Sequence, residues 1–102
     1  MMTYDVETRF GNYVVYGKTH SYIENRNLAI QLYDAQDHSP FARLTVNLGW
    51  KLPENQAFVD TNNCPWAEKF IKENGLGKPL NKFESSGYCD YPLYEFNLEK
   101  FR

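Results

Sequence analysis

The stretch DTNNCPWAEKFIKENG, residues 60–75, carries the one strong helical pattern in this chain, and the strand-like remainder is interpreted around it. Trp66, Phe70 and Ile71 recur at the spacing of a single helix face, whereas charged residues occupy the opposite face. A short helix of this kind buries its apolar stripe against other elements. The stretch therefore predicts an amphipathic helix that covers the core of the protein.

The two ends of this helix are also marked in the sequence. Asn62 or Asn63 is predicted to cap the first turn, because either side chain can accept a hydrogen bond from a free N–H group there. Pro65 suits the same turn, since it lacks a donor. Gly75 is predicted to end the helix in the left-handed conformation, with Leu76 folding back as the apolar contact of a Schellman motif.

Outside this stretch, apolar and polar residues alternate with the period of half-buried strands. Gly11 and Asn12 are expected to form the tight turn of a first hairpin, because both tolerate positive φ. Gly17 is interpreted as a β-bulge. Pro92 has no N–H group and confines the start of the last strand to a sheet edge or a bulge. The predicted strands cover residues 3–10, 13–23, 28–33, 41–48, 57–59, 80–85 and 91–101.

Length and composition are consistent with one folded unit. The chain has 102 residues, of which 42% are hydrophobic and 17% aromatic, too apolar a composition for disorder. We expect a single domain over residues 1–102. Its predicted class is α+β: an antiparallel sheet of about five to seven strands, arranged as a meander, packed against one α-helix.

Charge and cysteine content restrict the partners and the compartment. The formal net charge is −2, so the sequence supports neither nucleic-acid binding nor attraction to an anionic membrane. No apolar run reaches the length of a membrane span, and the first residues lack a signal peptide, so we expect a cytoplasmic protein. Cys64 and Cys89 are expected to be reduced thiols in that compartment.

Residue types that carry catalysis are present but are not grouped in the sequence. His20 and His38 are interpreted as surface residues. Cys64 in the first helical turn has two readings, a thiol with a lowered pKa or a small residue packed beside Trp66, and the second is favoured. The spacing of the two cysteines fits no metal site. We expect a protein that is not an enzyme and that holds no metal or cofactor.

The best candidate for a binding surface is the aromatic segment 85–94. Tyr88, Tyr91 and Tyr94 lie near a predicted turn and, together with Trp50, form a predicted contact patch, because tyrosine offers amphipathic area at low entropic cost. The same rings can instead lean on the helix and fill the edge of the core. The sequence favours packing but leaves both alternatives open.

Three segments resemble a family of small uncharacterised bacterial proteins. They are the N-N-x-P-W run at 62–66, the glycine-rich segment 74–79, and the closing S-G-Y-C-D-Y-P-L-Y-E-F run at 86–96. With the strand at 41–48, the likeness spans about residues 28–98. The resemblance implies an origin in gut Firmicutes and their mobile elements or phages, and it implies no catalytic residues.

Two functions of different classes follow. The first is a non-enzymatic accessory protein of a mobile element or phage that binds another protein through the tyrosine and tryptophan patch. The alternative is a small-ligand protein that holds a nucleotide-like planar molecule, with Asn62, Asn63 and the start of the helix as donors toward an anion. This alternative predicts a concave pocket at the start of the helix. A monomer and a homodimer paired through an exposed strand edge both fit the sequence.

Overall fold

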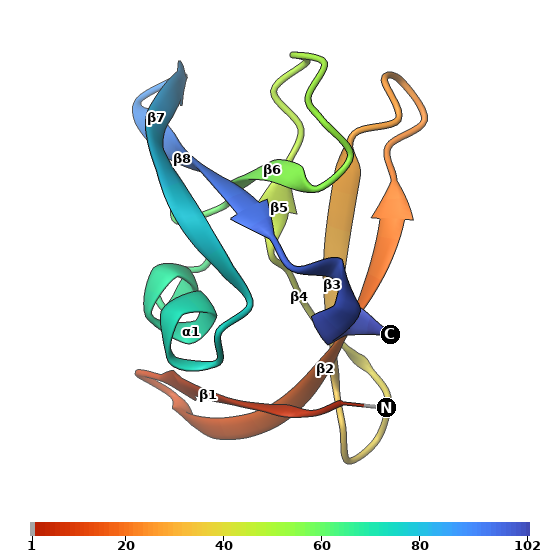
Figure 1. Ribbon diagram of the computed structural model, residues 1–102. Helices are drawn as coiled ribbons and strands as arrows, with labels where there is room; N and C mark the ends of the chain where they lie inside the picture. The colour runs from red at the N-terminus through yellow and green to blue at the C-terminus, as the bar shows by residue number, and fades with distance from the viewer. Residues whose placement is uncertain (1) are drawn as a thin grey trace.

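The computed structural model describes residues 2–102, which form two four-stranded antiparallel sheets and one α-helix (Figure 1). The strand orders are β1-β2-β3-β4 and β5-β6-β8-β7. The predicted class, α+β with antiparallel sheet packed on a helix, is confirmed, with the strands divided between two sheets. The elements are β1 (Tyr4–Thr8), β2 (Gly11–Ser21), β3 (Leu28–Asp34), β4 (Pro40–Arg43), β5 (Thr45–Val46), β6 (Gln56–Val59), α1 (Ala67–Glu73), β7 (Gly77–Ser86), β8 (Cys89–Phe96) and the 3₁₀ helix η1 (Leu98–Phe101).

The chain passes from the first sheet to the second at Leu44. The predicted strand 41–48 is interrupted there, so its two halves pair with different neighbours as β4 and β5. The amide of fully buried Leu44 donates to the carbonyl of Ile30 at 2.9 Å, and its carbonyl accepts from the amide of Asp60 at 2.9 Å. Thr45 accepts the amide of Ile30 on Oγ1 at 3.1 Å. This corner holds the two sheets against each other.

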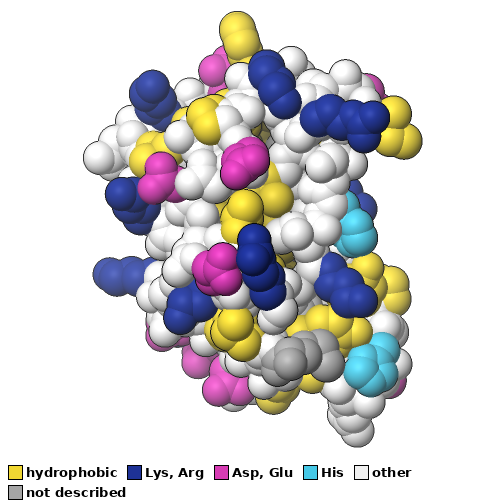
Figure 2. Space-filling model, turned by 45° about the vertical axis from the view of Figure 1, so that its right-hand side comes forward, with side chains coloured by type: hydrophobic (Ala, Val, Ile, Leu, Met, Phe, Trp, Pro, Cys, Tyr) yellow, Lys and Arg dark blue, Asp and Glu magenta, His cyan; other side chains and the backbone are white. Residues whose placement is uncertain are grey.

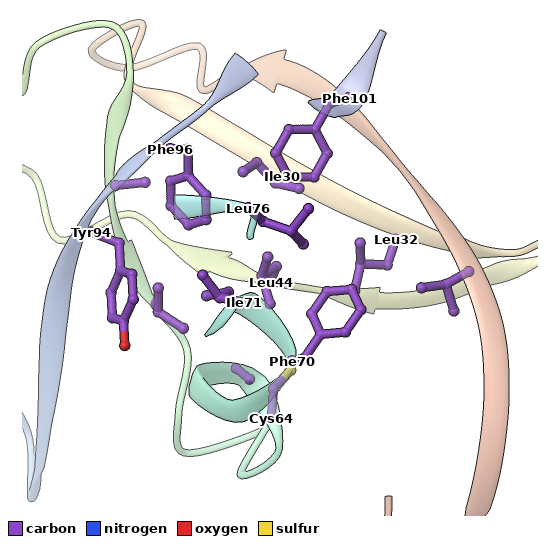
Figure 3. Close-up of a cluster of buried hydrophobic side chains, with 14 of the residues drawn as sticks. Ile30, Leu32, Leu44, Cys64, Phe70, Ile71, Leu76, Tyr94, Phe96 and Phe101 are labelled. Atoms are coloured by element: carbon purple, nitrogen blue, oxygen red, sulfur yellow. The ribbon is translucent and has the colours of Figure 1, made fainter. Parts of the chain in front are cut away.

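The core lies between the sheets and beside the helix. Figure 3 shows Phe70 and Ile71 projecting from α1 into a cluster that includes Leu44 and Leu76. In Figure 1 the helix lies between β7 and β1, which belong to different sheets. The apolar stripe therefore covers the core as the sequence predicts. Other members of the cluster are Val6, Val15, Ile30, Leu32, Val59, Tyr94, Phe96 and Phe101.

The start of the helix differs from the prediction. Its N-cap is Trp66, and no side chain accepts a hydrogen bond from its first turn, so the prediction that Asn62 or Asn63 caps it is wrong. Asn63 turns back instead: its amide and its side-chain Nδ2 donate to the carboxylate of Asp60 at 3.1 and 2.9 Å. A charged acceptor in the preceding turn satisfies these donors before the helix begins.

The end of the helix follows the prediction. Gly75 has φ of 63°, and its amide donates to the carbonyl of Lys72 at 3.3 Å. The amide of Leu76 donates to the carbonyl of Ile71 at 3.0 Å, and both side chains are fully buried. These two bonds are those of a Schellman motif, which is confirmed.

The first hairpin forms, but its turn lies two residues earlier than predicted. Arg9 and Phe10 make the turn, and Gly11 pairs with Thr8 as the first residue of β2. Thr8 holds this turn through Oγ1, which accepts from the amide of Phe10 at 3.1 Å and donates to the carbonyl of Gly11 at 3.0 Å. Phe10 consequently leaves the core face and is 77% exposed.

Three further predictions concern the long strands. Gly17 is not a bulge, since β2 keeps continuous register with β3 from Val15 to Ser21. A Cβ at Gly17 would lie 2.6 Å from the Phe101 ring, so glycine is required by packing. Residues 98–101, predicted as strand, form η1, and this short helix brings Phe101 onto Gly17. Pro92 pairs with Phe83 of β7, whereas the pairing of β8 with β6 stops at the neighbouring Leu93, as the missing donor of Pro92 requires.

We predict that Gly17→Ala lowers the free energy of unfolding by about 1–3 kcal/mol, because the added methyl overlaps the Phe101 ring. Urea unfolding of the wild type, both single variants and the double variant measures the effect. In a Phe101→Ala background, Gly17→Ala should change the free energy of unfolding little, since the obstructing ring is gone. An equal cost in both backgrounds would show that packing against Phe101 is not the reason for glycine.

Candidate functional site

The residues predicted as a contact patch lie at different depths. Tyr88 and Trp50 are exposed, Tyr91 is half-buried, and Tyr94 is 5% exposed in the core. Among residues 2–102, no aromatic ring pair joins Tyr88, Tyr91 and Trp50. The loops that carry Tyr88 and Trp50 lie at the end of the molecule shown uppermost in Figure 1.

Tyr94 has a structural role. Its hydroxyl donates to Oε1 of Glu68 on the helix at 2.6 Å, joining β8 to α1. Burial, and then this hydrogen bond to a carboxylate, raise the pKa of Tyr94 above its ordinary value. The ring therefore fills the edge of the core and ties the helix to the second sheet.

Trp50 belongs to a loop that is fixed by its backbone. The buried side chain of Asn27 donates through Nδ2 to the carbonyl of Trp50 and accepts on Oδ1 from the amide of Leu52 at 2.9 Å. Asn25 adds a bond to Asn47 at 2.9 Å. The indole is held on an ordered loop without being packed in the core.

The principal concavity lies at the opposite end, at the start of the helix. A cleft of about 810 Å³ is enclosed by the end of the β1–β2 hairpin (residues 7–10 and 13), by β4 (residues 41 and 42), and by residues 62–66. We call it the aromatic cleft. It lies where the small-ligand alternative places a pocket, and it includes Asn62 and Asn63. Phe10, Tyr13 and Phe41, which line it as well, are absent from the site residues chosen from the sequence.

Three rings in contact, those of Tyr13, Phe41 and Trp66, form the floor of the aromatic cleft, and a fourth, Phe70, continues the row into the core. The ring centroids of Tyr13 and Phe41 are 5.2 Å apart, those of Phe41 and Trp66 are 5.8 Å apart, and those of Trp66 and Phe70 are 5.7 Å apart. The planes are tilted or perpendicular, the arrangements that aromatic rings prefer. Phe70 is buried, so the floor is anchored on the core.

The mouth of the aromatic cleft carries both charge signs. Glu7 on one wall forms an ion pair with Lys69 of the helix, in which Lys69 Nζ and Glu7 Oε1 are 3.4 Å apart. The guanidinium of Arg9 lies over the Phe10 ring, 4.8 Å from its centroid. Within residues 2–102, no carboxylate lies within ion-pair distance of Arg9. Arg9 is thus the uncompensated charge at the mouth.

Several hydrogen-bond donors just before the helix are already bonded within the chain. Asn63 is bonded to Asp60, and the amide of Cys64 donates to the Asp60 carbonyl at 2.9 Å. The amide of Ala67 donates to the carbonyl of Cys64 at 2.9 Å. These donors are occupied, and the Asp60 carboxylate lies beside them. The second function predicted from the sequence uses Asn62, Asn63 and the helix start to bind an anion. Of these, the Asn63 donors are already bonded to a carboxylate, which does not favour their role in binding an anion.

Cys64 lies beneath the aromatic cleft and is 3% exposed. Its thiol donates to the carbonyl of Arg43 at 3.6 Å. Burial, and then the nearby Asp60 carboxylate, raise the pKa of the Cys64 thiol to about 11. This is opposite to the lowered pKa that a reactive thiol requires, and it agrees with the packed residue favoured from the sequence.

The remaining groups that carry chemistry are dispersed. His20 and His38 are both exposed, and the cyan imidazoles lie well apart in Figure 2, on a face where Lys, Arg, Asp and Glu are mixed. Residues 2–102 hold no cluster of three His, Cys, Asp or Glu side chains suited to a metal ion. Both cysteines are free thiols. In the same range, α1 and η1 are too short and polar to cross a bilayer.

Comparison with known families gives one match. The model of a family described as a domain of unknown function, DUF4313, matches residues 17–102. The chain belongs to the DUF4313 family. No curated protein and no solved structure matches it. The range matched by DUF4313 contains Phe41 and Trp66 but begins after the hairpin residues 7–10 and 13, so the aromatic cleft combines the family domain with an N-terminal wall outside the match.

Hairpin geometry explains why Phe10 and Arg9 were not identified as site residues from the sequence. Alternation places Phe10 on the buried face with Tyr4 and Val6, and only the turn held by Thr8 moves it out. The Thr8-Arg9-Phe10-Gly11 run contains the one usable signal, because a threonine can accept the amide two residues later. That signal competes with the stronger turn preference of Gly11 and Asn12.

We predict that Cys64 reacts with iodoacetamide at pH 8 on the order of 100-fold more slowly than an ordinary thiol of pKa about 8.5, because so little of it is thiolate. A Cys89→Ser variant isolates the signal, and mass spectrometry measures the rate. The same variant in denaturant should react at the ordinary rate. Equally fast labelling in the folded state would contradict the assignment of Cys64 as an inert packed residue.

Proposed function

We propose that this protein works by binding and not by catalysis, and that the aromatic cleft is its binding site for another protein. The observation that carries the proposal is the row of rings from Tyr13 to Phe70, which is fixed to the core at Phe70, together with the exposed Phe10 ring that lines the same cleft. A rigid aromatic surface lowers the entropic cost of association. Aromatic residues are also common among those that contribute most of the binding energy at interfaces.

The chemistry of the described residues supports binding over catalysis. The thiol beneath the aromatic cleft is buried with a raised pKa, and the imidazoles lie elsewhere on the surface. A nucleophile needs a base within hydrogen-bond reach, and Cys64 bonds to a backbone carbonyl instead. That the protein serves a mobile element or phage stays a prediction from the sequence resemblance.

A second candidate is a small planar ligand. The volume of about 810 Å³ lies within the range of small-molecule sites, and rings from three elements line the cleft. A thermal-shift screen with nucleotides tests this candidate, since a ligand that binds only the folded state raises the melting temperature. No stabilisation by any nucleotide at millimolar concentration would remove it.

We predict that Phe10→Ala reduces capture of a protein partner roughly tenfold, the loss expected when one aromatic anchor is removed from an interface. Phe10 is 77% exposed, so the substitution leaves the core intact. The measurement is quantitative pull-down from a lysate of the source cells with wild-type and variant baits.

The matched control is Phe83→Ala, which removes a phenyl ring that is 65% exposed from β7, outside the aromatic cleft. Tyr88→Ala and Trp50→Ala test the patch predicted from the sequence. Loss of capture in these variants, with Phe10→Ala unchanged, would place the binding site at the opposite end of the molecule and contradict the proposal.

A further inference from the structure

We propose, on the basis of the proposed function, that the aromatic cleft takes an acidic peptide segment in which an aromatic side chain is adjacent to a carboxylate. The aromatic group packs on Phe41 and Trp66, and the carboxylate pairs with Arg9 at the mouth. The inference deepens the proposed function by stating the chemistry of the partner.

The charge of the mouth is the first step. Glu7 and Lys69 compensate each other, and Arg9 is left without a carboxylate among residues 2–102, so these three groups sum to +1. The chain as a whole has a net charge of −2. The Asp60 carboxylate nearby is buried and bonded to Asn63, so Arg9 is the cation of this mouth that is left to pair with a partner's carboxylate. A partner with an acidic segment can pair with this cation, and such a charge pair adds selectivity.

The placement of Arg9 is the second step. Stacking of the guanidinium on Phe10 at 4.8 Å holds the cation beside the aromatic lining. An interaction of this kind is stabilising even at an exposed site. A guanidinium fixed by its face still presents its N–H donors at the edge, where they can bind a carboxylate in a bidentate manner. The cleft thus offers an apolar floor and an oriented anion-binding group side by side.

The third step decides between a carboxylate and a phosphate. A phosphate group is bound by several donors, commonly free backbone amides at a helix start. Here α1 has only seven residues, the amides of Asn63, Cys64 and Ala67 are already bonded, and the Asp60 carboxylate lies beside them. Arg9 is then the cation of the mouth that has no carboxylate partner among residues 2–102, whereas Lys69 is paired with Glu7. One guanidinium can neutralise one carboxylate but only part of the charge of a nucleotide's phosphates, which favours a peptide over a nucleotide.

The N-terminal wall sets this preference. Glu7 and Arg9 precede the residues matched by the DUF4313 family, whereas Phe41 and Trp66 lie within them. The aromatic floor accordingly supplies affinity for an apolar ring, and the hairpin supplies selectivity for the charge next to it. Changes in the hairpin should alter which peptides bind without removing the ability to bind.

The experiment selects binders from random heptapeptides displayed on phage. Three forms of the intact chain serve as targets: the wild type, Arg9→Glu and Lys82→Glu. Lys82→Glu makes the same change in net charge on β7, outside the aromatic cleft. On the wild type and Lys82→Glu we expect enrichment of peptides with Trp, Tyr or Phe next to Asp or Glu. On Arg9→Glu we expect Lys or Arg in place of the acid.

A synthetic peptide from the enriched set then gives affinities by NMR titration. Arg9→Gln and Lys69→Ala should each weaken it roughly threefold, and Glu7→Gln should strengthen it by a similar factor, the effect of one exposed charge contact. Because Glu7 and Lys69 lie at the surface, these variants keep the fold.

The outcomes separate the inference from the proposed function. The inference would be overturned if the wild type selected aromatic peptides with no preference for Asp or Glu, or if Arg9→Glu selected the same peptides as the wild type. Either result would leave the aromatic cleft as the binding site. Absence of any peptide whose binding depends on Phe10 would overturn both. Selective stabilisation by a nucleotide in the thermal-shift screen would overturn the choice of a peptide as occupant.

Discussion

The corner at Leu44 and Thr45 is the constraint on which the rest of the structure depends. Here one extended segment leaves the first sheet and enters the second, and its polar groups are paired on both sides. Without this change of partner, the two sheets would have no shared core for α1 to cover. The corner also ends β4 next to the loop that precedes the helix, which brings Phe41 within reach of Trp66.

The aromatic cleft follows from the same arrangement. Tyr13 comes from β2, Phe41 from β4, and Trp66 from the residue that caps α1, so the floor joins three elements distant in sequence. The last ring, Phe70, is part of the core. Stability and binding surface are therefore coupled here, because the rings that line the cleft also pack the helix against the first sheet.

Local patterns predicted much of the fold. The helix and its Schellman ending are encoded within a few residues around Phe70 and Gly75, so the sequence alone was sufficient. The interruption at Leu44 was not predictable from alternation, because both halves of the segment keep a period of two while their hydrogen-bond partners change. The requirement for Gly17 depends on Phe101, more than eighty positions away, and no local rule reports that contact.

The site was predictable only in part, because its walls come from segments that are distant in sequence. The sequence predicts a pocket at Asn62 and Asn63 because they neighbour the helix, and both residues line the aromatic cleft. Its other wall comes from a hairpin whose turn is set by the Thr8 side chain rather than by Gly11. The most direct test of the account is the set of NOEs between the Phe41 and Trp66 rings, whose centroids lie 5.8 Å apart. Strong ring-to-ring NOEs are predicted; their absence, with residues 41–48 in one uninterrupted ladder, would contradict both the corner and the aromatic cleft.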